Sequence, residues 1–254
     1  MANQYLSEAL GSPAVGGIAV IGGAEARHAV TVSRLSVGEI VRVGNGLGMI
    51  ASGTVTAVAP AEFRFEVETI ETIERPSPAI WLAQALAKGD RDELAIQAAT
   101  ELGVDGVIPW TAARSISRWE GSKVAKGQER WGVVVREATK QSARAWLPEV
   151  APLVNTKQLA ALAETVRMIV LDPLAELSLT GVALRQAQEP GNEPQEPDND
   201  IVLVVGPEGG ISPAEFDLLH SAGAVSVRLG GSILRTSTAG PAAIAVLSAK
   251  LGRW

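Results

Sequence analysis

The chain of 254 residues contains no cysteine, and aromatic residues make up only 4% of it. The lack of cysteine excludes disulfides, thiolate metal ligands and cysteine nucleophiles. The two histidines, His28 and His220, are too few and too far apart in sequence to indicate a metal site. No apolar run approaches the length of a membrane-spanning helix, and the start lacks the basic and apolar regions of a signal peptide. We therefore expect a cytoplasmic protein without metal or membrane.

The formal charge of −6 argues mildly against a nucleic-acid partner, because phosphate binding favours a basic surface. Its distribution is uneven: between Arg114 and Arg144 the chain has eight lysines and arginines against three glutamates. A charged run is usually a solvated helix face. Concentration of positive charge in one segment of an acidic protein instead favours a patch that contacts phosphates. Both interpretations remain open, and we favour the second.

The proline-containing linker Glu74–Pro78 separates two predicted domains with different sequence patterns. Residues 1–75 contain short alternating strands separated by turn residues, with a helix from Ala24 to Leu35 between the first two, which predicts a small β-barrel. In residues 76–254 strands alternate with helices, which predicts an α/β domain with a mainly parallel sheet covered on both faces. Within it, residues 186–200 contain three prolines and five acids, the composition of a disordered loop.

The elements expected in the second domain before that loop are strands at Ile80–Leu86, Gly106–Pro109 and Met168–Leu171, and helices at Arg91–Leu102 and Val124–Ala145. In the long helix a polar set should share one face, at spacings of three, four and seven, namely Arg130, Glu137, Gln141 and Arg144. Val133, Val134 and Ala138 should then face inward. The alternative function of this stripe is an ion-pair network that stiffens an exposed helix.

Two glycine-rich turns near the carboxyl end follow short apolar strands. The strand Ile201–Val205 leads into Gly206–Ile211, and a capping box at Ser212 and Glu215 then begins a helix. The strand Val225–Leu229 leads into a second turn rich in glycine, serine and threonine, followed by a helix of small residues.

Ligands of open α/β sheets bind beyond the carboxyl ends of the strands, and glycines allow a ligand to approach the main chain. We therefore expect the two turns, at adjacent strand ends, to form one ligand site lined by main chain. The alternative is that glycines after strands serve only the fold. Neither turn matches a Rossmann fingerprint or a P-loop, which disfavours a dinucleotide or a nucleoside triphosphate.

The segments Val204–Ser212 and Leu229–Ala239 resemble the cofactor region of the SPOUT methyltransferases. They are most similar to the ribosomal RNA small subunit methyltransferase E family, which methylates N3 of a uridine in 16S ribosomal RNA. Further matches at Lys88–Arg91, Glu101–Val104, Arg114–Ser115 and within Glu137–Arg144 extend the resemblance over most of the second domain. It implies a SPOUT domain with a deep trefoil knot that holds S-adenosyl-L-methionine, a homodimer, and a PUA-like first domain that helps to hold RNA.

The resemblance implies that the cofactor lies on the main chain of both turns. The cofactor-binding residues expected from it are Leu171, Val205, Gly206, Pro207, Glu208, Gly209, Gly210, Leu229, Gly230, Ser232, Ile233, Leu234, Thr236, Thr238 and Ala239. The RNA-binding residues expected are Arg27, His28, Arg34, Lys88, Arg91, Arg118 and Lys140. The RNA partner implied is 16S ribosomal RNA of the small ribosomal subunit.

Methylation at N3 requires that a proton leave the uracil and that the resulting anion be stabilised. Arginine suits the second task because it stays charged and presents a fork of donors. Arg235 follows the second turn, and Arg114 and Arg144 belong to the basic segment. Glu137 is a candidate proton acceptor by position only, with water as the alternative. Trp119, beside the basic segment, is the candidate surface for stacking a splayed base.

Two other functions remain open at this point. One is a SPOUT enzyme that methylates a ribose hydroxyl of ribosomal or transfer RNA. The other is a ribosome assembly factor that keeps the fold and binds RNA without catalysis. The absence of cysteine excludes covalent thiol activation of pyrimidine C5, so that methylation is expected at nitrogen or oxygen.

Overall fold

The computed structural model describes residues 3–181 and 199–254, so the predicted loop 186–200 lies outside the described residues except for its last two. Asp200 belongs to the folded part: its main-chain oxygen accepts from Arg167 N and its carboxylate from Ala79 N, both at 2.9 Å. The chain forms two compact units. The first comprises Met1–Arg75 and Thr139–Leu147, and the second comprises Pro76–Ala138 and Pro148–Trp254.

The first unit is built on one curled five-stranded sheet. Its order is β1 (Asn3–Leu6), β3 (Ile40–Gly44), β4 (Met49–Ala59), β5 (Glu62–Thr72) and β2 (Ile18–Gly22), with η1 (Glu8–Leu10) and α1 (Gly23–Thr31) beside it. The strands β1 and β3 are parallel, and the other neighbours are antiparallel. Over the part of the chain that the structure describes, no ladder joins β1 to β2, so the predicted barrel is a curled, open sheet. The sequence pattern did not predict β1.

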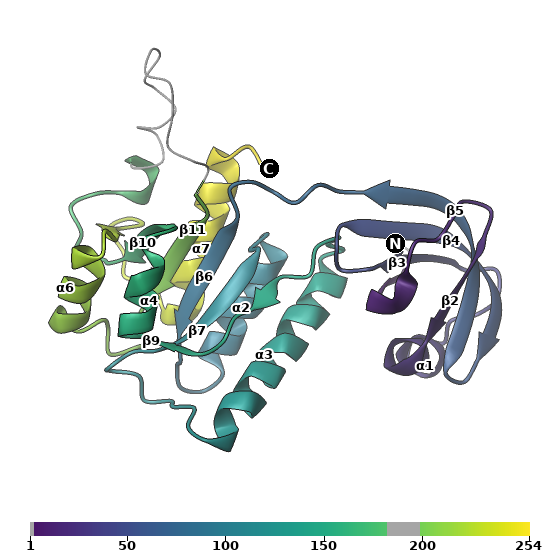
Figure 1. The fold of residues 1–254 in the computed structure, drawn as a ribbon, viewed down its shortest axis with the longest axis horizontal. Coiled ribbons are helices and arrows are strands. Elements are labelled where there is room, and N and C mark those ends of the chain that lie inside the picture. Colours follow the sequence, from purple (N-terminus) through teal and green to yellow (C-terminus); the bar gives the residue numbers. More distant parts are fainter. Residues whose placement is uncertain (1–2, 182–198) are drawn as a thin grey trace, which may run out of the picture. The chain divides into compact units, whose positions relative to one another are not determined.

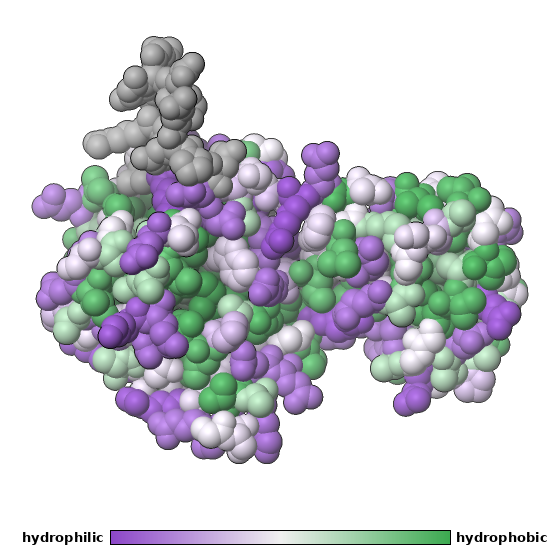
Figure 2. Space-filling model, viewed as in Figure 1, coloured by the Kyte–Doolittle hydropathy of each residue, from purple (hydrophilic) through white to green (hydrophobic). Residues whose placement is uncertain are grey.

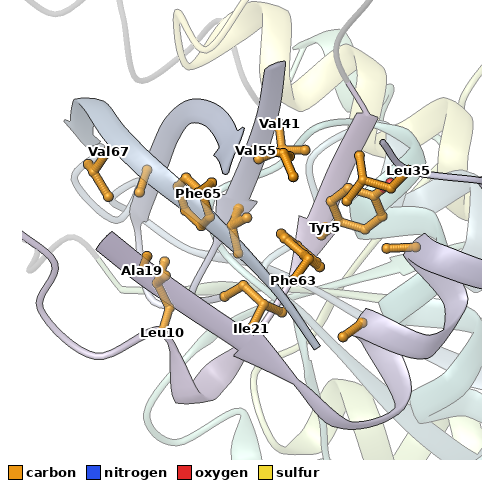
Figure 3. Close-up of a cluster of buried hydrophobic side chains, with 14 residues drawn as sticks. Tyr5, Leu10, Ala19, Ile21, Leu35, Val41, Val55, Phe63, Phe65 and Val67 are labelled. Atoms are coloured by element: carbon orange, nitrogen blue, oxygen red, sulfur yellow. The ribbon is translucent and has the colours of Figure 1, made fainter. Parts of the chain in front are cut away.

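The core of the first unit comes from strand alternation, which places every second side chain on the same face. Along β5, Phe63, Phe65 and Val67 are buried, whereas the residues between them are exposed. Figure 3 shows these side chains gathered with Tyr5 and Leu35 in one cluster. The rings of Tyr5 and Phe63 lie 5.5 Å apart between centroids. The chemistry of the first unit therefore has to come from its exposed surface.

Two helices end earlier than the sequence predicted. The helix α1 ends at Thr31, so Arg34 lies beyond it with a φ of 55°. The helix α3 (Ser122–Gln141) ends before Ala143, whose φ is also 55°. Helical spacing is lost there, so the prediction that Arg144 shares a helix face with Arg130 is wrong.

The segment Thr139–Leu147 belongs to the first unit through specific contacts. Lys140 Nζ lies 3.3 Å from Glu25 Oε2, and the two side chains are 9% and 11% exposed. Trp146 Nε1 donates to Ile73 O at 2.8 Å. These partners lie far away in sequence, so helix periodicity gave no sign of them.

The second unit is built on a parallel sheet. Its order is β12 (Val225–Val227), β10 (Arg167–Leu171), β11 (Ile201–Val205), β6 (Ile80–Ala85), β7 (Gly106–Thr111) and β8 (Glu149–Val150), and β9 (Val154–Asn155) also pairs with β7. The helices besides α3 are α2 (Arg91–Glu101), α4 (Thr156–Leu162), α6 (Pro213–Ser221) and α7 (Thr236–Lys250). Every described strand pair is parallel. The α/β architecture expected from the sequence is confirmed.

Helices cover both faces of this sheet (Figure 1). Met168, Val202 and Val204 pack on one face in a cluster with side chains of α4 and α6. On the other face α2 and α7 contact the central strands. Gly240 of α7 approaches so closely that an added Cβ would lie 2.8 Å from Leu82 Cδ1. Burial on both faces explains why β11 is apolar at all five positions.

The strand order corrects one expectation about the two turns. They follow β11 and β12, and these strands are not neighbours because β10 lies between them. The turns therefore flank the carboxyl end of β10 instead of standing at adjacent strand ends. The trefoil knot implied by the resemblance stays a prediction.

The inward side of α3 differs in part from the expectation. Ala138 is buried as expected, whereas Val134 is only half-buried and Val133 is 49% exposed. Trp131 and Val135 share the buried side with Ala138, at spacings of four and three. The surface seen in Figure 2 mixes hydrophilic and hydrophobic residues. None of the described helices combines the length and the hydrophobicity that a membrane-spanning segment requires.

Candidate functional site

A cavity of about 590 Å³ lies in the second unit over the ends of three neighbouring strands. It is lined by Leu171–Leu174 after β10, by Val205–Glu208, Gly210 and Ile211 after β11, and by Val227, Leu229, Gly230 and Ser232–Thr236 after β12; Arg91, Phe216 and Ala239 complete it. Ligand pockets typically enclose about 300–1,000 Å³. The cavity is therefore large enough for a small-molecule ligand.

All residues predicted for the cofactor line this cavity except Gly209 and Thr238. Their contact with a cofactor remains a prediction. Sequence reasoning missed Asp172, Pro173 and Leu174, which line the cavity after the middle strand. The apolar strand that ends at Leu171 could have indicated them, because its carboxyl end lies at the same edge of the sheet.

The first turn is closed by its glycines. A Cβ added at Gly206 would lie 2.7 Å from Ile211 Cγ1 and 3.3 Å from Ile211 N, so a larger residue would displace Ile211. Gly210 has a φ of 72°, which favours glycine, and its N–H donates to Pro207 O at 2.9 Å. The turn therefore presents main chain to the cavity in a fixed shape.

Glu215 holds the first turn in place. Its carboxylate accepts from Ala113 N, Thr156 Oγ1 and Ser212 Oγ, each at 2.8 Å, and from Ser212 N at 3.0 Å. The residue is only 6% exposed. Burial opposes ionisation, but these hydrogen bonds outweigh it and hold the pKa of Glu215 below its ordinary value. The capping box read from the sequence thus also ties the start of α6 to the ends of β7 and β9.

The second turn leaves its main chain open. Within the described part of the chain, the N–H groups of residues 229–234 make no hydrogen bond to protein. A Cβ added at Gly230 or Gly231 would meet nothing within 4 Å. Residues 230–234 are exposed and Leu229 is half-buried, so these donors can bond to water or to a ligand in the cavity.

Thr236 joins the two turns. Its hydroxyl donates to Gly206 O at 2.8 Å and accepts from Gln84 Nε2 at 2.8 Å. Gln84 is fully buried in β6, and Thr236 is 8% exposed at the start of α7. The hydroxyl of Thr236 is thus used within the protein, and it fixes the distance between the two walls of the cavity.

Glu208 connects the first turn to α2. Its Oε1 accepts from Arg91 Nη1 at 2.8 Å and from Lys88 N at 3.1 Å. Burial opposes ionisation of Glu208, yet its own N–H and these donors together lower the pKa of the carboxyl below its usual value. A carboxylate therefore lines the cavity with one arginine beside it.

The structure separates the predicted catalytic residues. Arg235 is exposed and lines the cavity, and Arg114 Nη1 donates to Gly209 O at 3.1 Å. Glu137 lies on the exposed side of α3 and outside the cavity lining. Arg144 belongs to the first unit. Only the first two are thus placed at the turns.

The predicted RNA-binding residues are spread over both units. Arg27, His28 and Arg34 are exposed in the first unit, and Lys88, Arg91 and Arg118 are exposed in the second. Lys140 differs because its ammonium is paired with Glu25 at low exposure. Its contact with phosphate stays a prediction that competes with this structural role. No cluster of three potential metal ligands occurs among the residues that the structure describes.

Comparison with known proteins adds independent information. A sequence model described as an RNA methyltransferase domain matches residues 74–248, and one described as an RNA methyltransferase PUA domain matches residues 21–68. The chain is 38% identical over 247 residues to the ribosomal RNA small subunit methyltransferase E of Mycobacterium bovis, covering 95% of this chain and 90% of that protein. For the protein of the same name from Bacillus subtilis, identity is 31% over 237 residues, covering 90% and 88%.

A solved structure agrees with these sequence matches. The ribosomal RNA small subunit methyltransferase E from Neisseria gonorrhoeae, bound to S-adenosyl methionine, has a TM-score of 0.82 at 27% identity and covers 98% of each chain. A match of this extent takes in both units and therefore both turns. The chain belongs to the ribosomal RNA small subunit methyltransferase E family.

Proposed function

We propose that this protein transfers the methyl group of S-adenosylmethionine to ribosomal RNA, and that the acceptor is N3 of a uridine in 16S RNA of the small subunit. The observation that carries the proposal is the cavity between the two turns, with the open N–H groups of residues 229–234 along one wall. Family membership and the relative bound to S-adenosyl methionine support the donor and the class of RNA.

The residues around the cavity suit this donor. Leu171, Val205 and Ile211 offer apolar surface for the adenosyl group, and the open main chain of residues 229–234 offers donors to its ring and ribose. The carboxylate of Glu208 complements a positive ligand. When bound, S-adenosylmethionine supplies an electrophilic methyl group on a sulfonium.

The protein's own contribution is placement and charge stabilisation. Arg235 lines the cavity, and its guanidinium can stabilise the negative charge that a uracil acquires when N3 loses its proton. Arg114 is held at the other turn by Gly209. The carboxylates that line the cavity belong to Asp172 and Glu208, whereas the predicted acceptor Glu137 does not line it.

We also propose a homodimer with a trefoil knot in its second unit, acting in the cytoplasm, where its ribosomal substrate is assembled. The PUA-type match over residues 21–68 supports a role of the first unit in holding RNA. Arg27, His28 and Arg34 are exposed there.

The test incubates the purified protein with labelled S-adenosylmethionine and, separately, assembled small subunits, naked 16S RNA and transfer RNA. Digestion and nucleoside analysis should yield N3-methyluridine from the first or second substrate. A product on ribose would refute the N3 assignment, and cofactor binding without methyl transfer would favour the assembly factor. Gly206→Ala, whose Cβ would meet Ile211 at 2.7 Å, should impair donor binding, and Gly132→Ala, which meets nothing within 4 Å and lies outside the cavity lining, is its control.

A further inference from the structure

A second cavity, of about 330 Å³, lies in the second unit and shares no lining residue with the first. It is lined by Ala87–Asp90, Asp92 and Glu93 at the start of α2, by Ile116, Ser117 and Trp119 in the segment before α3, and by Gly127, Arg130 and Trp131 of α3. Its size falls at the lower end of ligand pockets, about 300–1,000 Å³. Nothing in the proposed catalytic arrangement uses it.

The aromatic wall of this cavity is fixed by α3. The ring of Trp119 stands at 80° to that of Trp131, with 5.4 Å between centroids. Trp131 is 1% exposed, whereas Trp119 is only half-buried. A Cβ added at Gly127 would lie 2.4 Å from Cδ2 and Cε2 of Trp119, so the indole lies directly against the helix backbone.

The contact with the Trp119 ring, and not a left-handed backbone conformation, explains why residue 127 is glycine. It lies inside α3 and has no left-handed φ, and glycine is among the least favourable residues in a helix interior. Gly132 of the same helix has open space at its Cβ position. Gly127 thus weakens helix propensity at the one place where the indole of Trp119 needs room.

The second cavity is connected to the first turn by short links. The segment that carries Trp119 begins at Ala113 and Arg114, which hydrogen-bond to Glu215 and to Gly209 O. Lys88 lines the second cavity, and its N–H donates to Glu208 of the first cavity. Because the Lys88–Glu208 hydrogen bond joins the two linings, the cavities are adjacent, and a base in the second cavity would belong to a nucleotide near the one that receives the methyl group.

Three of the five charged side chains in the lining are held by protein partners, whereas Lys88 and Asp90 are exposed and carry opposite charges. Arg130 pairs with Glu93 at 2.8 Å, and the buried Asp92 carboxylate accepts from the N–H groups of Ala87 and Glu93. The half-buried indole of Trp119 gives the lining an aromatic surface, with polar groups around it. This chemistry suits an uncharged aromatic base better than a small ion, and Arg118 next to Trp119 is exposed and can reach a phosphate.

We propose that this cavity binds one unstacked base of the RNA substrate, next to the methylated nucleotide, with the base stacked on Trp119. The proposal rests on the proposed RNA methyltransferase function. It assigns Trp119 to substrate binding and Gly127 to the positioning of its ring.

The decisive experiment compares Gly127→Ala with Gly132→Ala. Both replace glycine with a better helix former in α3, but only the first places a Cβ against the indole. Affinity for naked 16S RNA and for assembled small subunits is measured by filter binding, and affinity for S-adenosylmethionine by calorimetry. Gly127→Ala should weaken RNA binding roughly tenfold, whereas Gly132→Ala should match the wild type, and both should bind the donor normally.

Trp119→Ala and Trp119→Phe give a second, independent readout. Loss of one stacked base predicts roughly tenfold to hundredfold weaker RNA binding for alanine and partial recovery for phenylalanine. If the wild type methylates RNA but the Trp119 and Gly127 variants bind it normally, the base pocket is refuted and the proposed function stands. If the wild type transfers no methyl group to any RNA, the proposed function fails and this proposal fails with it.

Discussion

Replacing Thr236 with valine tests how the cavity is built. The change keeps the shape of the side chain but removes the hydroxyl that donates to Gly206 O and accepts from Gln84 Nε2, both at 2.8 Å. A buried polar group left unpaired costs about 1–3 kcal/mol. Gly206 O would lose this donor, whereas Gln84 Nε2 keeps Ala85 O at 3.1 Å, so we expect a loss of about 1–3 kcal/mol.

The assay is urea unfolding of the second unit at pH 7, combined with calorimetric titration of S-adenosylmethionine. Thr236→Val should unfold at lower urea and bind the donor more weakly, because the first turn is no longer held to the start of α7. Thr236→Ser keeps the oxygen and should stay close to the wild type. A valine variant as stable as the wild type, with unchanged donor affinity, would refute the reasoning that this hydroxyl couples the turns.

Three further predictions concern charge. Arg235→Ala should lower kcat about 100-fold or more with little loss of RNA affinity. If kcat and RNA affinity fell by the same factor, the Arg235 side chain would only bind substrate. Glu215→Gln should lower the free energy of unfolding by about 2–4 kcal/mol at neutral pH. Folding lowers the pKa of Glu215, so its carboxylate stabilises the fold above the ordinary pKa of 4.5, and this stabilisation is lost as pH falls through the folded pKa. The difference in free energy of unfolding between the wild type and the glutamine variant should therefore disappear in acid. A difference that does not change with pH would contradict this reasoning. Neutralising Arg27 and Arg34 should make RNA binding less dependent on salt. The slope of the logarithm of the RNA-binding constant against the logarithm of salt concentration should fall in magnitude by about 0.7–0.9 for each phosphate that the protein no longer neutralises. The control is Arg64→Gln, which should leave the slope unchanged because the Arg64 guanidinium pairs with a nearby carboxylate.

The parts of the fold that sequence predicted well are those with local causes. The buried strand Ile201–Val205 and the capping box at Ser212 carry their signals within a few residues, and the structure has both where they were predicted. The two turns could be recognised as a site because glycines follow apolar strands. Most of the cavity lining could therefore be predicted from short stretches of sequence.

The errors arise from contacts between distant residues. Sequence could not show that β10 lies between β11 and β12, so the two turns were expected at adjacent strand ends. It could not show that Thr139–Leu147 packs with the first unit, and the helix was extended to Ala145. The internal partner of Thr236 and the indole above Gly127 likewise depend on residues that meet only in the fold.

In the proposed complex, the main chain of the two turns holds the methyl donor in the cavity over β10, β11 and β12. A crystal grown with S-adenosylmethionine can show this. We expect donor density in this cavity, with hydrogen bonds to main-chain groups between residues 229 and 234. Donor bound elsewhere on the protein, or an empty cavity at a saturating donor concentration, would contradict it.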